Sequence, residues 1–357
     1  MHTSLAAPPK GRLVRRALPG LALTLTAALA LSACGGSDSN EDANGLTKVN
    51  VRTDVYFTGS VLPLVAGVEQ GIFEKHGLNV TLNAGKGSAT TLQTVANGSD
   101  DIGYADAGAL VQAVGKKMPL KMVAGMVQSS PLAVFVRKDS GITSAKDLAG
   151  KTAGYTAGSA AETLFPAFAK ISGLDPESVK LNKVDIPTRD SLFVQGKTDF
   201  SFGLLNVTEP NMTLNCCELT ALGYGDAGLD VLSSGIVTSD KYLDGNAETV
   251  RKFLAATAEA VEAANTDPDA AVESFFKVAT TSTLSKEVVK EQWLATAKLA
   301  TSARTADEPF GCTSTADWES TIKLMEDYAG VEAGAVTPAG AASNAFLSQC
   351  SDALGEE

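Results

Sequence analysis

Short apolar runs alternate with amphipathic segments through the first two thirds of the chain. Runs that are apolar throughout, or at every second position, predict strands at 48–52, 78–82, 102–104, 120–127, 132–137, 153–155, 179–184, 199–205 and 229–233. Apolar positions three and four residues apart predict helices between them, at 61–70, from 88 to a stop at Gly98, and at 109–115, 159–170 and 188–194. This alternation predicts an α/β fold with mainly parallel sheets flanked by helices.

The last part of the chain, 237–357, is predicted to be mostly helical. Asn246 is expected to cap a helix whose apolar stripe includes Phe253. Two later stripes contain Trp293 and Trp318. Because each tryptophan shares its stripe with other apolar residues, we expect both to lie in the core rather than against a ligand.

The stretch 85–106 has the pattern of a glycine loop, a helix, a glycine stop and a buried strand. A similar unit follows later, because an aspartate lies three residues after a helix-ending glycine in both: Asp101 after Gly98, and Asp199 after Gly196. Each unit is preceded by a Gly-Ser helix start, Gly87-Ser88 and Gly158-Ser159. Two units of similar plan predict two lobes with a cleft between them, although helix–Gly–Asp–strand is also common in unrelated α/β proteins.

The first 33 residues have the pattern of an export signal. Basic residues up to Arg16 precede an apolar run at 17–31, which is short for a stable membrane helix. Leu31-Ser32-Ala33-Cys34 is similar to the lipobox of bacterial lipoproteins, which implies cleavage before Cys34 and a lipid on its sulfur. An ordinary signal peptide with an incidental cysteine is the alternative. Residues 34–46 predict a flexible tether, and we expect a protein anchored on the outer face of the cytoplasmic membrane.

Charge narrows the classes of partner. The 357 residues carry a formal charge of −12, and the first 33 contribute four cations and no acid, which leaves −16 on the remainder. So acidic a chain is a poor candidate for binding nucleic acid. The length and the 44% hydrophobic content suit two packed domains.

Polar and aromatic side chains gather at the carboxyl ends of the predicted strands, where open α/β sheets bind ligands. We expect Gly85 and Gly87 to let the backbone approach a solute, and Ser88 to cap its helix. The candidate ligand-binding residues are Asp54, Tyr56, Phe57, Lys86, Ser88, Thr90, Asp106, Ser129, Gly158, Ser159 and Glu209. Further rings that could stack on a heterocycle are Tyr104, Tyr155 and Phe202.

Two signals compete over the ligand. The Gly-Ser helix starts, with Lys86 nearby, favour an anion such as a sulfonate, nitrate or phosphate. The acids Asp54, Asp106 and Glu209 instead favour an amino group, such as an aminopyrimidine presents beside a stacked ring. Each acid alone is more often a solvated loop residue or a helix cap. The three together favour an amino-bearing heterocycle.

Several motifs resemble the NMT1/THI5-like branch of periplasmic solute-binding proteins. They are Tyr56-Phe57-Thr58-Gly59, Glu69-Gln70-Gly71-Ile72-Phe73, Gly87-Ser88, Asp101-Ile102-Gly103, Lys138-Asp139-Ser140-Gly141-Ile142, Asp147-Leu148-Ala149-Gly150-Lys151-Thr152 and Gly158-Ser159. The resemblance implies a type II periplasmic-binding-protein fold with two lobes, joined by hinge strands near 135–138 and 232–236. Lobe 1 would comprise 47–136 and 237–357, and lobe 2 would comprise 137–236.

The same resemblance implies a function. The protein would capture a small solute, for which a thiamine pyrimidine precursor is our first choice, and deliver it to the membrane subunits of an ABC permease. Alkanesulfonate, taurine and nitrate are the alternative solutes. The protein would act as a monomer and needs no cofactor.

Four cysteines remain after Cys34. In an exported chain they predict disulfides, for which we favour Cys312–Cys350, with Cys216–Cys217 as a vicinal pair. A bond from Cys216 or Cys217 to Cys312 is the alternative. Adjacent cysteines without a nearby histidine make a poor metal site, so no metal is expected.

Catalytic motifs are absent from the sequence. His2 lies in the expected signal peptide and His76 in a predicted surface turn, and no nucleophile elbow, Walker loop or HExxH motif occurs. We therefore expect a binding protein rather than an enzyme. A THI5-like pyrimidine synthase and a ligand sensor are the alternatives.

Overall fold

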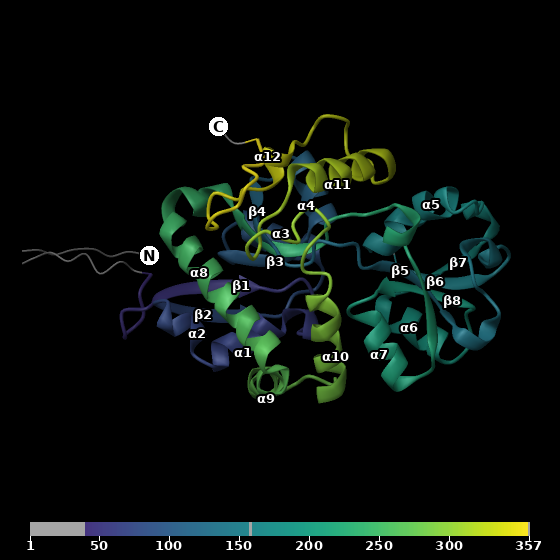
Figure 1. Ribbon diagram of the computed structural model, residues 1–357, viewed down its shortest axis with the longest axis horizontal. Helices are drawn as coiled ribbons and strands as arrows, with labels where there is room; N and C mark the ends of the chain where they lie inside the picture. The colour runs from purple at the N-terminus through teal and green to yellow at the C-terminus, as the bar shows by residue number, and fades with distance from the viewer. Residues whose placement is uncertain (1–39, 157–158, 356–357) are drawn as a thin grey trace, which may run out of the picture. The chain divides into compact units, whose positions relative to one another are not determined.

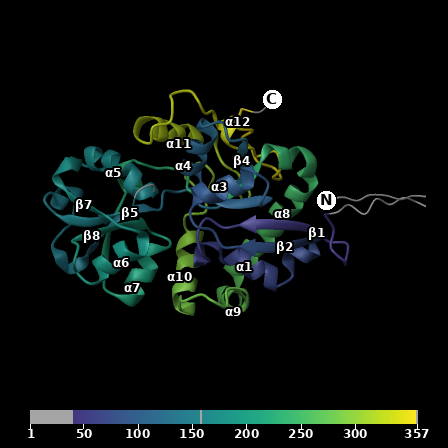
Figure 2. The same cartoon turned by 180° about the vertical axis from the view of Figure 1, so that it is seen from behind.

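The computed structural model describes residues 40–156 and 159–355, which contain two five-stranded sheets flanked by helices (Figures 1 and 2). The expected signal peptide, the lipid-attachment residue Cys34, the tether up to residue 39 and Gly158 lie outside the described residues. Residues 40–46 form a turn that folds back on the first strand, where the backbone N–H of Lys48 donates to the carbonyl of Asn40 at 2.8 Å.

The first sheet has the strand order β2-β1-β3-β10-β4. Its strands are β1 (Thr47–Arg52), β2 (Leu78–Asn83), β3 (Ile102–Asp106), β4 (Leu120–Gly125) and β10 (Ser234–Ser239). Strand β1 pairs in parallel with β2 and β3, whereas β10 lies antiparallel between β3 and β4. Four strands therefore run one way and β10 runs the other.

The second sheet repeats this plan in the order β7-β6-β8-β5-β9. Its strands are β5 (Leu132–Arg137), β6 (Thr152–Tyr155), β7 (Lys180–Lys183), β8 (Phe200–Leu204) and β9 (Leu219–Gly223). Here β5 is the reversed strand, because it is antiparallel to both β8 and β9. The reversed strand is in each case the first strand after the chain has crossed from the other sheet: β5 follows β4 of the first sheet, and β10 follows β9 of the second. The expected mainly parallel α/β architecture is confirmed.

The chain crosses between the sheets twice, at 126–131 and at 224–233. The hinge expected near 135–138 is wrong, since 132–137 is strand β5 of the second sheet. Of the hinge expected near 232–236 only residues 232 and 233 lie in the second crossing, because β10 of the first sheet begins at Ser234. The strand expected at 229–233 is also wrong, because its apolar side chains are buried within the second crossing, and sequence reasoning missed β9. Burial alone does not distinguish a strand from a packed connection. The division of the chain into lobes stays a prediction.

Helices cover both sheets. Those of the second sheet are α5 (Ala160–Ile171), α6 (Ile186–Val194) and α7 (Thr208–Asn215). The remaining α-helices are α1 (Leu62–Glu69), α2 (Ile72–Lys75), α3 (Ser88–Ala96), α4 (Ala107–Gly115), α8 (Asp240–Thr266), α9 (Pro268–Val278), α10 (Lys286–Ala297), α11 (Thr315–Tyr328) and α12 (Pro338–Ala341). Short 3-10 helices lie at Gly59–Val61, Lys138–Ser140, Ala145–Leu148, Pro176–Ser178 and Gly225–Ala227.

The C-terminal helices return to the first sheet, as expected. Trp293 of α10 is buried in the first-sheet core, and Trp318 of α11 is buried in a core that residues of both sheets share, which confirms the predicted role of both. Asn246 marks a helix boundary, as expected, because its backbone is non-helical (φ −137°, ψ 29°) and two helices run together across it as α8. The first of these begins at Asp240 with Ser239 as its cap, and the side-chain amide of Asn246 donates to the carbonyl of Tyr242 at 3.2 Å. Among the described residues, no helix is both long and apolar enough to cross a bilayer.

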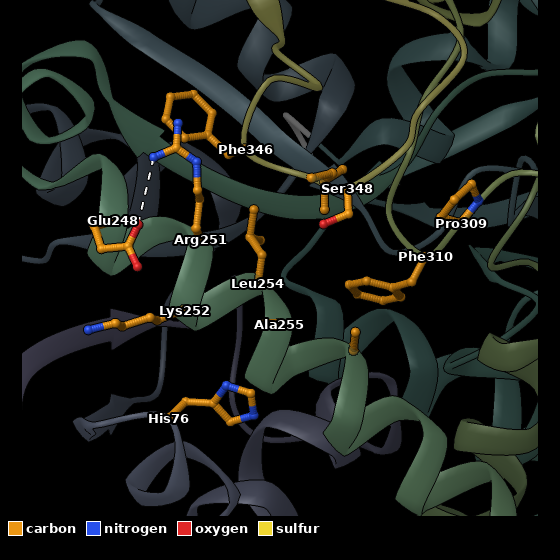
Figure 3. Close-up of a pocket in the computed structure, with 12 residues that line it drawn as sticks. His76, Glu248, Arg251, Lys252, Leu254, Ala255, Pro309, Phe310, Phe346 and Ser348 are labelled. Atoms are coloured by element: carbon orange, nitrogen blue, oxygen red, sulfur yellow. Dashed lines mark ion pairs between the residues drawn. The ribbon is translucent and has the colours of Figure 1, made fainter.

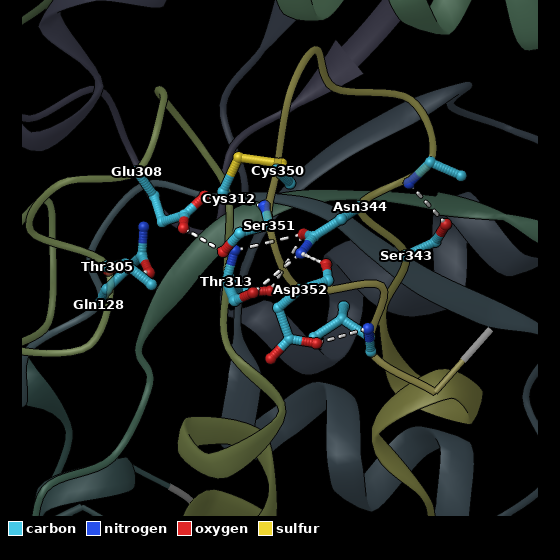
Figure 4. The surroundings of a disulfide bond; sticks show 12 residues. Gln128, Thr305, Glu308, Cys312, Thr313, Ser343, Asn344, Cys350, Ser351 and Asp352 are labelled. Atoms are coloured by element: carbon cyan, nitrogen blue, oxygen red, sulfur yellow. Dashed lines mark hydrogen bonds between the residues drawn. A yellow bond between two sulfur atoms is a disulfide. The ribbon is translucent and has the colours of Figure 1, made fainter.

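Both predicted disulfides are present. Cys312 and Cys350 are joined with their Cα atoms 5.6 Å apart, and Cys216 is joined to Cys217. The first bond ties the C-terminal segment to the loop before α11, beside a buried network in which Asn344 donates to the carbonyl of Thr313 at 2.8 Å (Figure 4). The alternative pairing of Cys312 with Cys216 or Cys217 does not occur.

The two sequence repeats make equivalent contacts. Asp101 accepts from the backbone N–H of Asn50 at 2.8 Å and donates its own N–H to the Asn50 carbonyl at 2.9 Å. Asp199 makes the same two contacts with Thr152, at 2.8 and 2.9 Å. Each aspartate thus ties the turn after a helix to the neighbouring strand. The predicted repeat is a structural one.

Candidate functional site

The candidate residues lie at one edge of each sheet. In the first sheet this edge holds the carboxyl ends of β1 and β3 and the amino end of the reversed strand β10. In the second sheet it holds the carboxyl ends of β6 and β8 and the amino end of β5. Both crossings, at 126–131 and 224–233, join these same two edges. The chain therefore brings together the strand ends where α/β sheets bind ligands.

Asp54 follows β1 at this edge and is half-buried. Its carboxylate accepts from the backbone N–H of Val55 at 2.8 Å. Burial raises the pKa of Asp54 to about 6, and the nearby carboxylate of Asp106 adds to this effect. Asp54 is therefore an acceptor that is held in place by its own loop and only weakly solvated.

The Asp54 loop rests on the glycine loop after β2. The backbone N–H of Gly85 donates to the carbonyl of Val55 at 3.0 Å, and a Cβ added to Gly85 would lie 1.9 Å from the carbonyl oxygen of Thr53. The close approach that we expected Gly85 to allow is therefore to the chain's own backbone rather than to a solute. Gly87 has a φ of 121°, a conformation that favours glycine, and it is the N-cap of α3.

Ser88 does not cap its helix, contrary to our expectation. Its hydroxyl oxygen accepts from the backbone N–H of Asp106 at 3.1 Å and so ties α3 to the end of β3. Asp106 is itself the cap of α4, since its carboxylate accepts from the N–H of Ala109 at 3.0 Å. Ser233, which precedes β10, donates to its other oxygen at 3.4 Å. Burial raises the pKa of Asp106.

Tyr56 is the exposed aromatic side chain of this edge. Its side chain is 59% exposed, unlike those of Tyr104 and Phe202, which are 1% and 0% exposed. The latter two were candidates for stacking on a ligand and are instead core residues. Phe57 packs partly buried against the first-sheet core, and Tyr155 is half-buried at the end of β6.

Tyr56 also links the two edges. Partial burial raises the pKa of its hydroxyl, and the carboxylates of Asp190 and Asp54 raise it further, whereas Arg189 lowers it. Asp190 and Arg189 belong to α6 of the second sheet. Charged groups of the second sheet therefore lie within electrostatic reach of a ring carried by the first.

Sequence reasoning missed a buried charged network at the second edge. Arg189 donates to Glu162 and to Asp190, each at 2.9 Å, and Glu162 and Arg189 are both buried. Glu162 also accepts from the N–H of Thr156 at 3.3 Å and from the hydroxyl of Ser159. Burial raises the pKa of Glu162, and Arg189 opposes that rise. The carboxylate of Glu162 thus lies at the start of α5, where the Gly-Ser pattern had favoured an anion as the alternative ligand.

The remaining candidates are less closely grouped. Lys86 and Thr90 are exposed on and after the glycine loop. Ser129, in the first crossing, donates to the carbonyl of Thr301 at 2.8 Å and so has a partner within the chain. Glu209 lies in the first turn of α7, and burial raises its pKa.

A separate cavity of about 490 Å³ lies on the first-sheet half and is lined by none of the candidate ligand-binding residues (Figure 3). Helix α8 contributes Arg251 and Leu254 to it, and the C-terminal region contributes Phe310 and Phe346. Arg251 lies 5.5 Å from the centre of the Phe346 ring. His76 lines the same cavity and bonds Glu259 at 2.8 Å. Within the described part of the chain, no cluster of three or more His, Cys, Asp or Glu side chains is arranged to hold a metal.

Comparisons with known proteins bear on this site. The chain is 24% identical over 312 residues to the formylaminopyrimidine-binding protein of Halalkalibacterium halodurans, which covers 86% of this chain and 93% of that protein. It is 23% identical over 174 residues to a 4-amino-5-hydroxymethyl-2-methylpyrimidine phosphate synthase of Legionella pneumophila, which covers 49% of this chain and 53% of the synthase.

A solved structure shares the fold. The alkanesulfonate-binding protein SsuA from Xanthomonas axonopodis pv. citri, bound to MOPS, superposes with a TM-score of 0.64 at 17% identity, over 85% of this chain and 98% of SsuA. That likeness confirms the expected two-lobe periplasmic-binding-protein fold and carries no information on the ligand. The sequence profile of the family described as NMT1/THI5 like matches residues 58–271, more than half of the chain. The chain therefore belongs to the NMT1/THI5-like family.

Proposed function

We propose that this protein is the extracytoplasmic solute-binding component of an ABC importer, and that its solute is an amino-bearing heterocycle such as a thiamine pyrimidine precursor. The solute would bind between the edges that carry Asp54 and Asp190. The observation that carries the proposal is the position of Tyr56, an exposed ring between carboxylates of both sheets.

The charges of the site favour an amino group over an anion. Asp54, Asp106, Glu162 and Asp190 are carboxyl groups, and the cations near them are Arg189 and the exposed Lys86 of the glycine loop. The guanidinium of Arg189 is already bonded to two of these carboxylates, and the start of α5 is taken by Glu162. A sulfonate placed here would face carboxylates, whereas an exocyclic amino group would donate to them.

Asp54 is suited to accept from such a group. One carboxylate oxygen accepts from the backbone N–H of Val55, which fixes the side chain. The second oxygen would accept from the amino group of the solute. Tyr56 would stack on the heterocycle, since aromatic rings pair in offset or edge-on arrangements. Micromolar binding needs about −8 kcal/mol in total, which a stacked ring and a few hydrogen bonds in a desolvated site supply.

Closure of the two lobes would desolvate the solute. We assign the first-sheet strands with the C-terminal helices to one lobe and the second sheet to the other, with the crossings 126–131 and 224–233 as hinges. The lobes already touch through α10, where Gln292 donates to the carbonyl of Val207 at 2.9 Å. A lipid on Cys34 would hold the protein near its permease at the outer face of the cytoplasmic membrane.

The named relatives support binding and leave a second candidate. The relative that covers most of both chains is named for binding formylaminopyrimidine, which is an amino-bearing heterocycle. The relative named as a pyrimidine phosphate synthase covers half of this chain and keeps a synthase activity as the alternative. We favour binding because the site described above holds carboxyl groups, a guanidinium and a phenol, and none of these is arranged as a nucleophile with its base.

Isothermal titration tests the ligand class. The purified protein is titrated with a hydroxymethyl aminopyrimidine, a formylaminopyrimidine and an alkanesulfonate. We expect heat from the pyrimidines and none from the sulfonate. The Asp54→Asn variant should bind the pyrimidines at least about tenfold more weakly than the wild type. The matched control is Asp244→Asn, on the exposed side of α8. Heat from the sulfonate alone, or unchanged binding by Asp54→Asn, would overturn the proposal.

A further inference from the structure

A disulfide between adjacent residues closes the end of α7. Cys216 is the residue after the last turn of the helix, and its bond to Cys217 precedes β9. Both cysteines are half-buried, so a solute has access to the bond. A bond between neighbours closes almost no loop, so it restrains the unfolded chain very little. Its contribution to stability through the unfolded chain is therefore small.

One of the two sulfurs lies beside a cation. The guanidinium of Arg137, at the end of β5, lies 3.5 Å from the sulfur of Cys216 and donates to the carbonyl of Val194 at 3.4 Å. The carbonyl of Val194 lies 4.0 Å from the same sulfur. These contacts place Cys216, and not Cys217, next to a fixed positive charge.

The other charges around this bond do not cancel that of Arg137. Asp139 is 3.9 Å from the Arg137 side chain but is 87% exposed, so water screens it. Glu218 follows Cys217 directly and is paired with Lys138 at 3.1 Å. A thiolate formed at Cys216 would therefore be stabilised by Arg137, whereas the contacts of the described residues give Cys217 no cation of its own.

We propose that Cys216–Cys217 is a thiol–disulfide exchange site whose co-reactant is a small or protein thiol. The incoming thiolate attacks the sulfur of Cys217, because Cys216 is the better leaving group beside Arg137. A new S–S bond forms between the co-reactant and Cys217, the Cys216–Cys217 bond breaks, and its electron pair leaves on Cys216 as a thiolate.

The exchange balances without a further oxidant. A second thiolate, from the same co-reactant when it is a dithiol or from a second molecule when it is a monothiol, attacks the co-reactant's sulfur in the mixed disulfide and releases Cys217 as a thiolate. The chain gains two electrons, and two protons once both thiolates are protonated, and the two thiols of the co-reactant are oxidised to a disulfide. The reverse sequence restores the bond. A vicinal dithiol on the reduced protein is also a chelator for a trivalent arsenical, which provides a probe.

The second disulfide serves as an internal control. Cys312 is 1% exposed, so burial would disfavour the thiolate that forms when Cys312 is the leaving group. Among the contacts of the described residues, none gives Cys312 a guanidinium neighbour like Arg137. Its bond to Cys350 spans a sequence separation of 38 residues and is braced by the network around Asn344 (Figure 4). Exchange should therefore be slower at this bond.

The test uses the folded protein with both disulfides formed. It is mixed with glutathione, quenched with iodoacetamide at intervals, and digested, and fragment masses locate glutathione and carbamidomethyl on Cys216 or Cys217. We expect glutathione on Cys217 and the alkyl group on Cys216, with Cys312–Cys350 still closed. Phenylarsine oxide should then bind to the dithiothreitol-treated protein at 216–217. Glutathione on Cys216, or equal opening of both disulfides, would overturn the proposal.

A variant isolates the role of the guanidinium. Arg137→Gln should slow the opening about threefold or more, whereas Arg137→Lys retains a charge and should stay close to the wild type. Arg251→Gln, a distant exposed arginine, is the control. If Arg137→Gln does not fold, as judged by far-UV circular dichroism, the opening rate of the wild-type disulfide is measured as a function of salt instead. Salt at 1 M should slow this opening, because it screens the charge of Arg137. A rate insensitive to both would refute the role of Arg137.

Discussion

The guanidinium of Arg189 lies 2.9 Å from the carboxylate of Glu162, and the two side chains are only 5% and 0% exposed. Asp190 lies at the same distance from the guanidinium on its other side. This buried network joins the start of α5 to α6 at the edge of the second sheet that faces Tyr56. The network connects the two helices at that edge and places the charged side chains of Glu162, Arg189 and Asp190 there.

Removal of the cation should be costly. Arg189→Met leaves Glu162 buried without its partner, so we expect the free energy of unfolding to fall by about 3–5 kcal/mol. The double variant Arg189→Met/Glu162→Gln should recover part of that loss, since no uncompensated charge remains buried. Urea unfolding measures both, with Lys170→Met, an exposed cation in the last turn of α5, as the control. A loss below about 1 kcal/mol in the single variant would contradict this view of the network.

Asp54 should make stability depend on pH. Its folded pKa of about 6 lies above its ordinary value of 3.8, so the folded state holds this proton more tightly than the unfolded state. The resulting stabilisation is lost as the pH rises from about 4 to 6, and the loss is complete above that range. Asp54→Asn should therefore gain stability over the wild type as the pH rises, on the order of 2 kcal/mol at pH 7.5. Urea midpoints at pH 4.5, 6 and 7.5 check the trend, and a constant difference would refute it.

Tyr56 should contribute its ring rather than its hydroxyl. If it stacks on a bound heterocycle, Tyr56→Ala should weaken binding about tenfold, because such ring pairs contribute about 0.5–1.5 kcal/mol beyond their buried area. Tyr56→Phe should bind within about twofold of the wild type. Because the side chain is 59% exposed, neither change should alter the unfolding midpoint much. Titration with an aminopyrimidine measures both, and a larger loss for Phe than for Ala would assign the contact to the hydroxyl.

Gly85 should be intolerant of a side chain. A Cβ there would lie 1.9 Å from the carbonyl oxygen of Thr53 and 2.6 Å from that of Asp54, and both atoms are backbone. Gly85→Ala must displace the Asp54 loop, so we expect a lower unfolding midpoint together with weaker ligand binding. Gly245→Ala is the matched control, since no atom lies within 4 Å of its added Cβ and its φ is not positive. Equal behaviour of the two variants would argue against a rigid contact between these loops.

The Cys312–Cys350 bond should stabilise the fold. For a sequence separation of 38 residues, restraint of the unfolded chain predicts a loss of about 4 kcal/mol in Cys312→Ser/Cys350→Ser. The corresponding variant of the vicinal pair, Cys216→Ser/Cys217→Ser, should lose far less. Urea unfolding of the two double variants measures the contrast, and the reverse order of stabilities would exclude this explanation.

Local patterns in the sequence determined much of this architecture. Alternating apolar runs predicted most strands, glycine stops predicted the ends of α3 and α6, and the matched positions of Asp101 and Asp199 predicted two units that the structure shows to be equivalent. These features depend on neighbours in the chain, so their periodicity is visible without a fold. The cysteine count and the expected compartment predicted disulfides, and the structure decided between the favoured pairing and its alternative.

Only the tertiary structure decided which polar groups have partners. Ser88 and Asp106 lie 18 positions apart in sequence, and their contact makes Ser88 a brace between α3 and β3 rather than a cap. The contact of Glu162 with Ser159, three residues earlier, is a local Ser-x-x-Glu pattern that we overlooked, whereas only the fold placed Arg189 of α6 beside Glu162. Burial likewise moved Tyr104 and Phe202 into the core and left Tyr56 exposed. Such assignments depend on distances between remote residues, which packing of the whole chain sets and local pattern does not.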